Sequence, residues 1–486
     1  MPAYEKVIDF LNTDWRKIEE ILIDPHQFPT KIGEIATKVT ALRHSVENPK
    51  EVTNQRDLYA TLAARQIEVF IRLCYRDGFA PILSSIVFSI EREIYDILLG
   101  SAVEKVGAEQ TKRVRDELLE MVSFFALDYN WTVYLHTLVT IQRIKRALNK
   151  YAAAIRGASK WAKQMDRFIT AGLNNIAAVL PLQIPIQWLI ECNVPVRLST
   201  EEVIEIHKLV KNLWVTLSGI AKVGFLPPAP VPEAEVLRFY SDFAEGTLRI
   251  IQEQLTSKYH LPPIGKPLRI VVVYGEEAKY TQSVAFFRET AGGQMEIVIF
   301  KPPQAPFNPA QDIHLLFHEG IPGHAYAAYL HLSQGGVIPV DEAMRITNLS
   351  GISFVDAFSV FHEGWAVFAQ KVGAELSESF DLNRYFFVEL LSYLERFMVL
   401  ENLVPLYTVK PHIPRFAEPF QFSSYFVGFL LWEILSQEQG MGNVWRTLSA
   451  GNYPIIPSGN LLINALKKLL EEAVAIKEQM RRETKD

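Results

Sequence analysis

The chain has 486 residues, of which 49% are hydrophobic and 21% charged, and its formal net charge is −6. This composition excludes extended disorder, and the length allows one large fold or two to three domains. No stretch gathers basic residues into a stripe that could follow a line of phosphates, so we expect no nucleic-acid partner, and no pattern indicates an oligomeric state.

From the N-terminus to about residue 257, apolar residues recur at the spacing of helices. The first such stripe consists of Val7, Phe10, Leu11, Trp15, Ile18, Ile21 and Leu22. A later helix has a clear start, because Ser199 followed by Glu202 makes a capping box. We therefore predict a helical N-terminal lobe over residues 1–258.

Neither an export signal nor a membrane span is visible in this sequence. The N-terminal residues lack the charged segment followed by an apolar segment that marks a signal peptide. The longest apolar run, residues 176–190, is interrupted by prolines and glutamines and is too short to cross a bilayer. We expect a cytoplasmic protein with no membrane partner, in which Cys74 and Cys192 are buried free thiols.

The pattern changes at residues 259–267, where three prolines and a glycine cannot continue a helix. Two runs rich in β-branched residues follow, at 268–274 and 294–300, and they predict strands of one small sheet. Helical spacing returns after Pro302 and Pro303. Residues 259–486 are thus expected to form either a second lobe or the continuation of a single fold.

Five of the eleven histidines lie between residues 314 and 362, where simple proportion would place about one. They are His314, His318, His324, His331 and His362. Both His-Glu dipeptides of the sequence, at 318–319 and 362–363, fall in this span within apolar helical patterns. Because ionisable groups buried together need a partner, the cluster indicates a metal site.

The spacing of His318 and His324 in His-Glu-Gly-Ile-Pro-Gly-His is unusual for two ligands of one ion. Residues four apart on a helix differ by about 40°, whereas these two, six apart, would differ by about 120°. The ring of Pro322 would clash with the carbonyl of His318, and Gly323 accepts dihedral angles that other residues cannot. We therefore predict a break or bulge at these two residues that returns His324 to the face of His318.

A competing arrangement needs no distortion, since His314 and His318 are four apart and would face one ion on a regular helix. If His324 is the ligand instead, His314 becomes a neighbour of the ligands or a pocket residue. His331, beyond the motif, is expected to be a packing or surface residue.

A third ligand is expected from a later helix, where Glu363 lies in Phe-His-Glu-Gly-Trp-Ala. The small residues Gly364 and Ala366 would let this helix approach that of His318 closely. Asp356, two turns earlier, is either an acceptor for the free nitrogen of a ligand histidine or a solvated acid.

These motifs resemble a bacterial family of unknown-function proteins that carries His-Glu-x-x-Pro-Gly-His and Glu-Gly-Trp-Ala and is related to the gluzincin metallopeptidases. The family's Tyr-x-x-Gly segment is matched by residues 425–428, so the resemblance covers roughly residues 261–440. Two departures are Ala325, where the family usually has another histidine, and the segment at residues 396–402, which lacks the family's aspartate. The resemblance implies a mainly α, gluzincin-like fold with a small sheet beside the metal-binding helices. It also implies that His318, His324 and Glu363 are zinc ligands and that Glu319 is the catalytic base.

The expected function is a zinc-dependent peptidase that acts on short peptides with one Zn²⁺ ion. Two histidines and a glutamate leave zinc an open position for water, and Glu319 would take the proton of that water as general base. Tyr425, with His362 as a second choice, would donate a hydrogen bond to the carbonyl oxygen under attack. Two alternatives remain: a metal-dependent amidase acting on a non-peptide amide, and a non-catalytic helical binding or scaffold protein with a structural or vestigial metal site.

Overall fold

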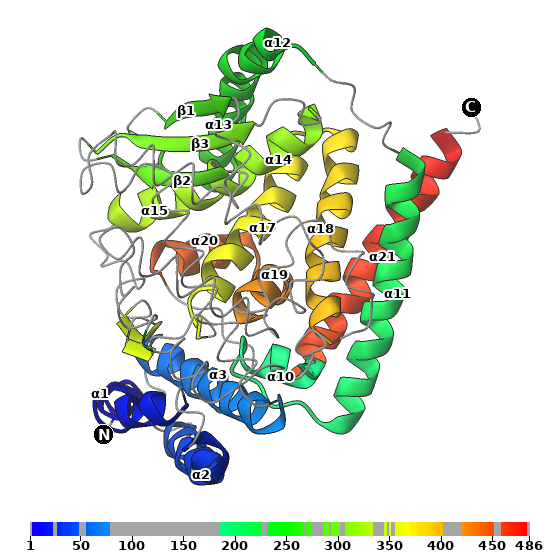
Figure 1. Ribbon diagram of the computed structural model, residues 1–486. Helices are drawn as coiled ribbons and strands as arrows, with labels where there is room; N and C mark the ends of the chain where they lie inside the picture. Colours follow the sequence, from blue (N-terminus) through cyan, green and yellow to red (C-terminus); the bar gives the residue numbers. More distant parts are fainter. Residues whose placement is uncertain are drawn as a thin grey trace. The chain divides into compact units, whose positions relative to one another are not determined.

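A computed structural model describes residues 2–22, 27–47, 55–77, 163, 184–224, 231–265, 268–274, 285–290, 293–301, 307–333, 345–347, 349–350, 355–401, 419–451 and 458–483. The protein is mainly helical with one small sheet, which confirms the predicted fold class (Figure 1). It divides into two compact units, each made of segments that are distant in sequence. Unit 1 comprises Met1–Cys192, Val340–Ala357 and Met398–Phe422, and unit 2 comprises Asn193–Pro339, Phe358–Phe397 and Ser423–Asp486.

Unit 1 contains the first three helices, α1 (Ala3–Leu22), α2 (Phe28–Val46) and α3 (Gln55–Asp77), which pack on one another, and the short α10 (Ile186–Glu191). The predicted apolar stripe of α1 is buried apart from Ile21, which is half-buried. At its centre the indole of Trp15 donates a hydrogen bond to the carbonyl of Ser350. Cys74 and Cys192 are buried free thiols, as predicted.

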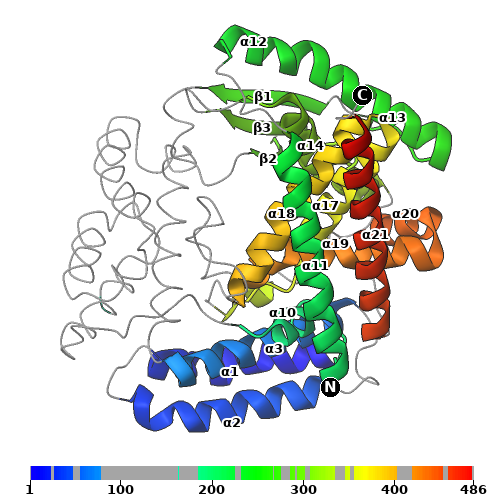
Figure 2. The same cartoon turned by 90° about the vertical axis from the view of Figure 1, so that its right-hand side faces the viewer.

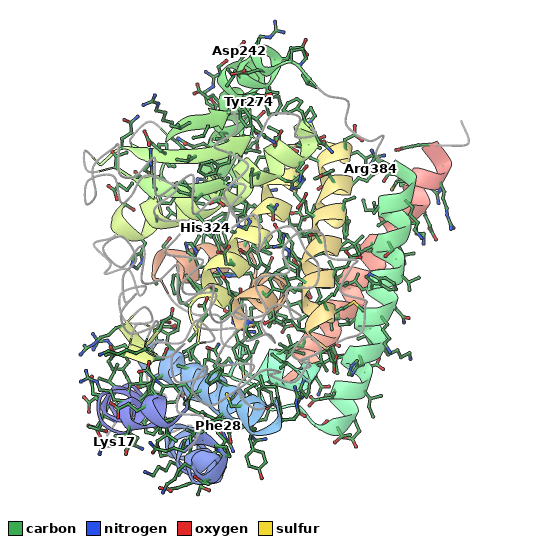
Figure 3. The ribbon with its side chains drawn as sticks, viewed as in Figure 1. Lys17, Phe28, Asp242, Tyr274, His324 and Arg384 are labelled. Carbon is green, nitrogen blue, oxygen red and sulfur yellow. The ribbon has the colours of Figure 1, made fainter. Side chains whose placement is uncertain are left out.

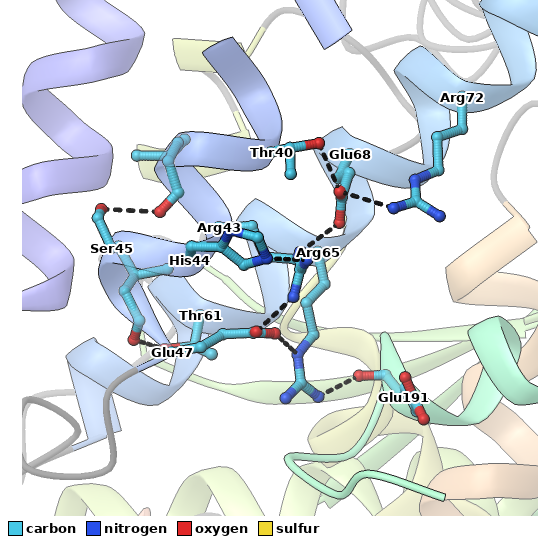
Figure 4. A network of polar contacts seen from close by, with 12 residues as sticks. Thr40, Arg43, His44, Ser45, Glu47, Thr61, Arg65, Glu68, Arg72 and Glu191 are labelled. Atoms are coloured by element: carbon cyan, nitrogen blue, oxygen red, sulfur yellow. Dashed lines mark hydrogen bonds and ion pairs between the residues drawn. The ribbon is translucent and has the colours of Figure 1, made fainter. Parts of the chain in front are cut away.

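A network of charged side chains joins α2 to α3 (Figure 4). Glu68 of α3 accepts a hydrogen bond from Arg72 and forms an ion pair with Arg43 of α2. Glu47, directly after α2, accepts hydrogen bonds from Arg43 and Arg65. Arg65 also donates to a backbone carbonyl of α10. Because every one of these carboxylates has an arginine partner, a buried layer of charge can hold the helices of unit 1 together.

The sheet of unit 2 consists of β1 (Leu268–Tyr274), β2 (Ala285–Glu289) and β3 (Met295–Lys301) in the order β1-β3-β2. β1 runs parallel to the central strand β3, and β2 runs antiparallel to it. The two predicted strands are confirmed, β1 with its predicted bounds and β3 one residue later. β2 was not predicted, because its five residues end in Arg288 and Glu289 and lack a β-branched residue.

The helices of unit 2 include α11 (Thr200–Gly224) and the C-terminal α21 (Gly459–Glu483), which lie side by side in both views (Figures 1 and 2). The predicted capping box opens α11: Ser199 N–H donates to Glu202 Oε2 over 2.8 Å, and Glu202 N–H donates to Ser199 Oγ over 3.2 Å. α12 (Glu233–Arg238), the π-helical turn η1 (Phe239–Ala244) and α13 (Glu245–Tyr259) follow one another without a gap.

The change of pattern expected at residue 259 is the end of α13, where His260 takes a left-handed conformation before the chain enters the sheet. This point falls within the Asn193–Pro339 segment of unit 2, and the first change of unit along the chain comes after Cys192.

The remaining helices of unit 2 surround the site described below. They are α14 (Pro309–Glu319), α15 (His324–Ser333), α17 (Ser359–Leu376), α18 (Phe380–Leu400), α19 (Pro419–Gln439) and α20 (Met441–Ser449). Lys371 of α17 is buried and pairs with Glu433 of α19 at 3.0 Å and with Glu472 of α21 at 2.9 Å. These ion pairs fix α17 against its two neighbours.

Among the residues that the structure describes, no helix is both long enough and apolar enough to cross a membrane.

Candidate metal centre

The predicted break in the helix between His318 and His324 is confirmed. α14 begins after Asn308, whose side chain accepts from the first free amides of the helix, and it ends at Glu319. Residues 320–323 are not helical, the Ile321–Pro322 peptide bond is cis, and α15 begins at His324. The side chain of His324 is labelled in Figure 3. A Cβ added to Gly323 would lie 1.8 Å from the carbonyl oxygen of His318, so only glycine fits where the chain turns back.

The break brings together the three side chains that were expected to bind metal. His318 Nε2 lies 3.2 Å from Glu363 Oε2, and His324 Nε2 lies 3.4 Å from the same oxygen. The imidazole rings are nearly perpendicular, with centroids 4.9 Å apart. One ligand atom from each residue falls within 4.8 Å of the others, and within the described part of the chain no other group of His, Cys, Asp or Glu side chains converges in this way.

The side chains of this group shift one another's pKa values. Burial alone would raise the pKa of Glu363, but hydrogen bonds and charges of the two histidines hold it well below its ordinary value. Burial alone would lower the pKa of His318, but the hydrogen bond and charge of Glu363, with the charge of Glu319, raise it. The carboxylate therefore keeps its negative charge while buried, and two nitrogens with one oxygen make the donor set that Zn²⁺ takes in catalytic sites.

Trp365 connects the second motif to the break. Its indole N–H donates to the carbonyl of Pro322 over 3.2 Å and to that of Gly323 over 3.4 Å, and the side chain is almost fully buried. The Phe-His-Glu-Gly-Trp-Ala pattern by itself indicates no contact between Trp365 and the break. The distance of Trp365 in sequence from the break concealed a direct role in holding the carbonyls of Pro322 and Gly323, the second of which also accepts from the amide of Ala327.

Gly364 was expected to let α17 approach α14 closely, but it faces α19 instead. A Cβ on Gly364 would lie 2.4 Å from the Cα of Gly428, so its small size allows α17 to cross α19 rather than α14. The glycine that faces α14 is Gly373, whose Cβ would meet the ring of Phe317 at 2.6 Å. The crossing of α17 and α19 explains the Tyr-x-x-Gly spacing, because Tyr425 lies one turn before Gly428 on α19.

Tyr425 lies beside the first histidine of the group. Its ring stacks on that of His318 with centroids 6.1 Å apart and planes 16° apart. The Tyr425 ring also stacks on that of Tyr393, with centroids 5.3 Å apart and planes 6° apart. The guanidinium of Arg396 lies over both tyrosine rings, 5.2 Å from the centroid of Tyr393 and 5.5 Å from that of Tyr425. Tyr425, the candidate hydrogen-bond donor to a substrate carbonyl oxygen, is therefore packed against both His318 and Tyr393.

His362 packs flat against His324, with centroids 3.8 Å and planes 14° apart. Burial lowers the pKa of His362 to about 3, so the imidazole is neutral at physiological pH. It can therefore fix the ring plane of His324 without adding positive charge beside a cation.

His314, the alternative ligand, lies outside the group. Its Nε2 is 2.8 Å from the carbonyl of Leu382, and its ring packs against Tyr385 and Phe386. Burial lowers the pKa of His314 to about 4, which leaves it neutral. The structure thus brings His318 together with His324 rather than with His314. His331 is a buried packing residue whose Nδ1 lies 3.2 Å from the carbonyl of Ser449.

Asp356 is not the acceptor beside His318, which was one of the two roles expected for it. Asp356 precedes α17 instead of lying on it, belongs to unit 1, and exchanges backbone hydrogen bonds with the amide of Gln66. The acceptor beside His318 Nδ1 is Gln370, at 3.4 Å. Sequence reasoning missed Gln370 because a carboxylate is the more usual partner of a ligand histidine. Its position seven residues after Glu363, on the same face of α17, was the available signal.

Glu319 is next to a ligand but is not a member of the group. Its Oε2 accepts a hydrogen bond from the backbone amide of Phe287 in β2, with 3.0 Å between the atoms. The side chain is buried, with 8% of the residue exposed. The predicted small sheet therefore lies beside α14 and α15, and its edge strand contacts the carboxylate that was expected to act as base.

Comparisons with known proteins give no family. No family model matches the sequence, and no curated protein matches it. A crystal structure of a "putative lipoprotein" from Colwellia psychrerythraea is similar over 88% of this chain and 78% of that chain, with 13% identity and a TM-score of 0.44. At these values the neighbour's name says nothing about the chemistry of this chain.

Proposed function

We propose that this protein is a metal-dependent peptidase that holds one Zn²⁺ ion with His318, His324 and Glu363. The observation that carries the proposal is the break after Glu319, which returns His324 to His318 and places three ligand atoms within 4.8 Å of one another. The same motifs support kinship with the gluzincin metallopeptidases. A helix that continued regularly through Pro322 would have pointed the two histidines in different directions.

Zinc in a site of two histidines and a glutamate acidifies a water molecule and polarises a substrate carbonyl. Glu319 takes the proton of the attacking water and delivers it to the leaving amine. The phenol of Tyr425, stacked beside His318, donates a hydrogen bond to the oxygen on which negative charge develops, and His362 is the second candidate for this role. Each step uses a group within or beside the cluster.

The edge strand favours a peptide over a small ester or a compact amide. Successive amides of a strand point to opposite sides, and that of Phe287 points to Glu319, so this edge of β2 faces away from β3. Ala285 and Glu289, two residues away in each direction, share that orientation. An extended peptide can pair with this edge, which would bring its backbone next to Glu319.

Replacing Glu319 by glutamine tests the proposal. We expect the variant to keep its zinc, because Glu319 is not a ligand, and to lose hydrolysis of a peptide mixture by a factor of ~10² or more. Zinc is measured by elemental analysis and cleavage by mass spectrometry. Glu438→Gln makes the same chemical change at an exposed position of α19 and should behave as the unaltered protein.

Unchanged turnover in Glu319→Gln would remove this residue from the mechanism. A wild-type protein that holds zinc but cleaves no peptide or other amide would show the site to be structural, as in a binding or scaffold protein. Chelation of the metal would then lower the melting temperature without removing any activity.

A further inference from the structure

We propose that Gln370 and Tyr393 are positioning residues that select the tautomer of His318 and hold Tyr425 beside it. This inference rests on the proposed function, because it concerns the site in which His318 would bind zinc. Both residues lie outside the sequence motifs, on α17 and α18 respectively.

The first observation is that α17 approaches both nitrogens of the same imidazole. Glu363 lies 3.2 Å from Nε2 of His318, and Gln370, two turns later, places Oε1 3.4 Å from Nδ1. An amide oxygen only accepts hydrogen bonds, so Nδ1 must carry the proton. With the proton of Nδ1 held by Gln370, the proton that a metal displaces from His318 is the one on Nε2, which leaves the tautomer that a metal ligand needs.

Tyr393 contacts the same oxygen of the Gln370 amide that faces Nδ1 of His318. Its hydroxyl donates to Gln370 Oε1 over 3.2 Å, and both side chains are buried. An amide turned around would present its NH₂ group to the tyrosine and to Nδ1. His318 would then offer its lone pair at Nδ1 and carry a proton on Nε2, where the metal should bind. A phenol hydroxyl can donate or accept, so Tyr393 positions the amide, and the orientation in the structure, with Oε1 toward both Tyr393 and Nδ1, is the one that gives the required tautomer.

The ring of Tyr393 completes a closed circuit of four side chains. Tyr393 stacks on Tyr425, Tyr425 stacks on His318, and His318 returns to Tyr393 through Gln370. The four side chains come from α14, α17, α18 and α19, so four helices together set the position of His318 relative to Tyr425. The orientation of the ligand and that of the oxyanion donor are thereby coupled, which neither residue could achieve alone.

Within the described residues, no side chain plays for His324 the part that Gln370 plays for His318. Nδ1 of His324 is buried and has no hydrogen-bond partner there, and the ring is held by its stacking on His362. The two histidines are thus positioned by different means, and only His318 should respond to a change at position 370.

The test measures the dissociation constant for zinc of the metal-free protein, by competition with a chromophoric chelator. Gln370→Leu should weaken zinc binding by ~10- to 100-fold, the usual effect of removing an outer partner of a ligand histidine. Gln370→Glu should strengthen zinc binding several-fold, since a carboxylate raises the basicity of the imidazole. Tyr393→Phe, which keeps the ring and is the variant least able to disturb folding, should weaken binding by a smaller factor than Gln370→Leu.

Gln66→Leu is the matched control, because Gln66 is also a buried glutamine whose amide makes hydrogen bonds, in this case to the backbone of Cys192 and Asp356, but it belongs to unit 1. Its zinc affinity should equal that of the unaltered protein. Equal losses in Gln66→Leu and Gln370→Leu, or affinities within twofold of wild type in Gln370→Leu and Tyr393→Phe, would overturn the inference. If the unaltered protein binds no zinc at all, the proposed function fails, and the inference that rests on it is overturned with it.

Discussion

The contact between Gly364 and Gly428 yields a quantitative prediction about how the site is held together. In the structure, a Cβ added to Gly428 would lie 2.1 Å from the carbonyl oxygen of Val360 and 2.7 Å from the Cα of Gly364. Both obstacles are backbone atoms of α17, so no side chain can move aside. Gly428→Ala must therefore separate α17 from α19, and with them Glu363 from Tyr425.

Overpacking of a well-packed core costs about 1–3 kcal/mol, and the rigid backbone obstacles place this substitution at the upper end. For a domain of some 150–250 residues, about 3 kcal/mol corresponds to a fall in melting temperature of roughly 6–12 °C. Calorimetry of the metal-free protein measures the shift, and the catalytic rate should fall further than stability alone explains, because Tyr425 moves.

Gly246→Ala serves as the control for Gly428→Ala. Gly246 lies in helix α13 with no atom within 4 Å of an added Cβ, so alanine there should raise stability by about 0.5–1 kcal/mol through its helix propensity. Opposite signs at the two glycines are the expected result. A Gly428→Ala protein as stable and as active as the unaltered one would refute the claim that this crossing positions the site.

Three further predictions concern the metal group. His314→Phe should bind zinc as the unaltered protein does, since His314 packs among aromatic rings; loss of zinc in equilibrium dialysis would favour the His314 and His318 pair. Trp365→Phe removes a donor to the buried carbonyl of Pro322 and should cost about 1–3 kcal/mol in urea unfolding; an unchanged midpoint would contradict that role. Because Glu363 raises the pKa of His318, zinc binding at neutral pH should release a proton, and zinc affinity should fall as the pH falls; calorimetry in buffers of different ionisation enthalpy would detect no such release if His318 were already neutral.

Local chemistry made the break predictable, and with it the approach of His324 to His318. Pro322 cannot continue the helix because of its ring and missing amide, and six-residue spacing would misdirect His324 unless the chain turned. Both facts are properties of neighbouring residues, so they can be recognised without tertiary structure. The same holds for the capping box of Ser199 and Glu202, which the structure reproduces in both of its hydrogen bonds.

What the sequence did not disclose depends on contacts between distant segments. Gly364 indicates that its helix packs closely against another helix, but the sequence does not show which one. In the structure the partner is Gly428 of α19. Asp356 was a reasonable acceptor by chemical type, yet the chain before α17 leaves it in the other unit and Gln370 takes the place. Strand β2 is too short to show a period, and pairing with β3 rather than its own composition makes it a strand.

The most direct test of the central claim is a crystal structure of the zinc-soaked protein with anomalous data collected at the zinc absorption edge. We predict one peak about 2.0–2.2 Å from Nε2 of His318, Nε2 of His324 and an oxygen of Glu363, with Glu319 beside it but not bound. No peak at this group, or a peak bounded by His314 instead of His324, would contradict the assignment.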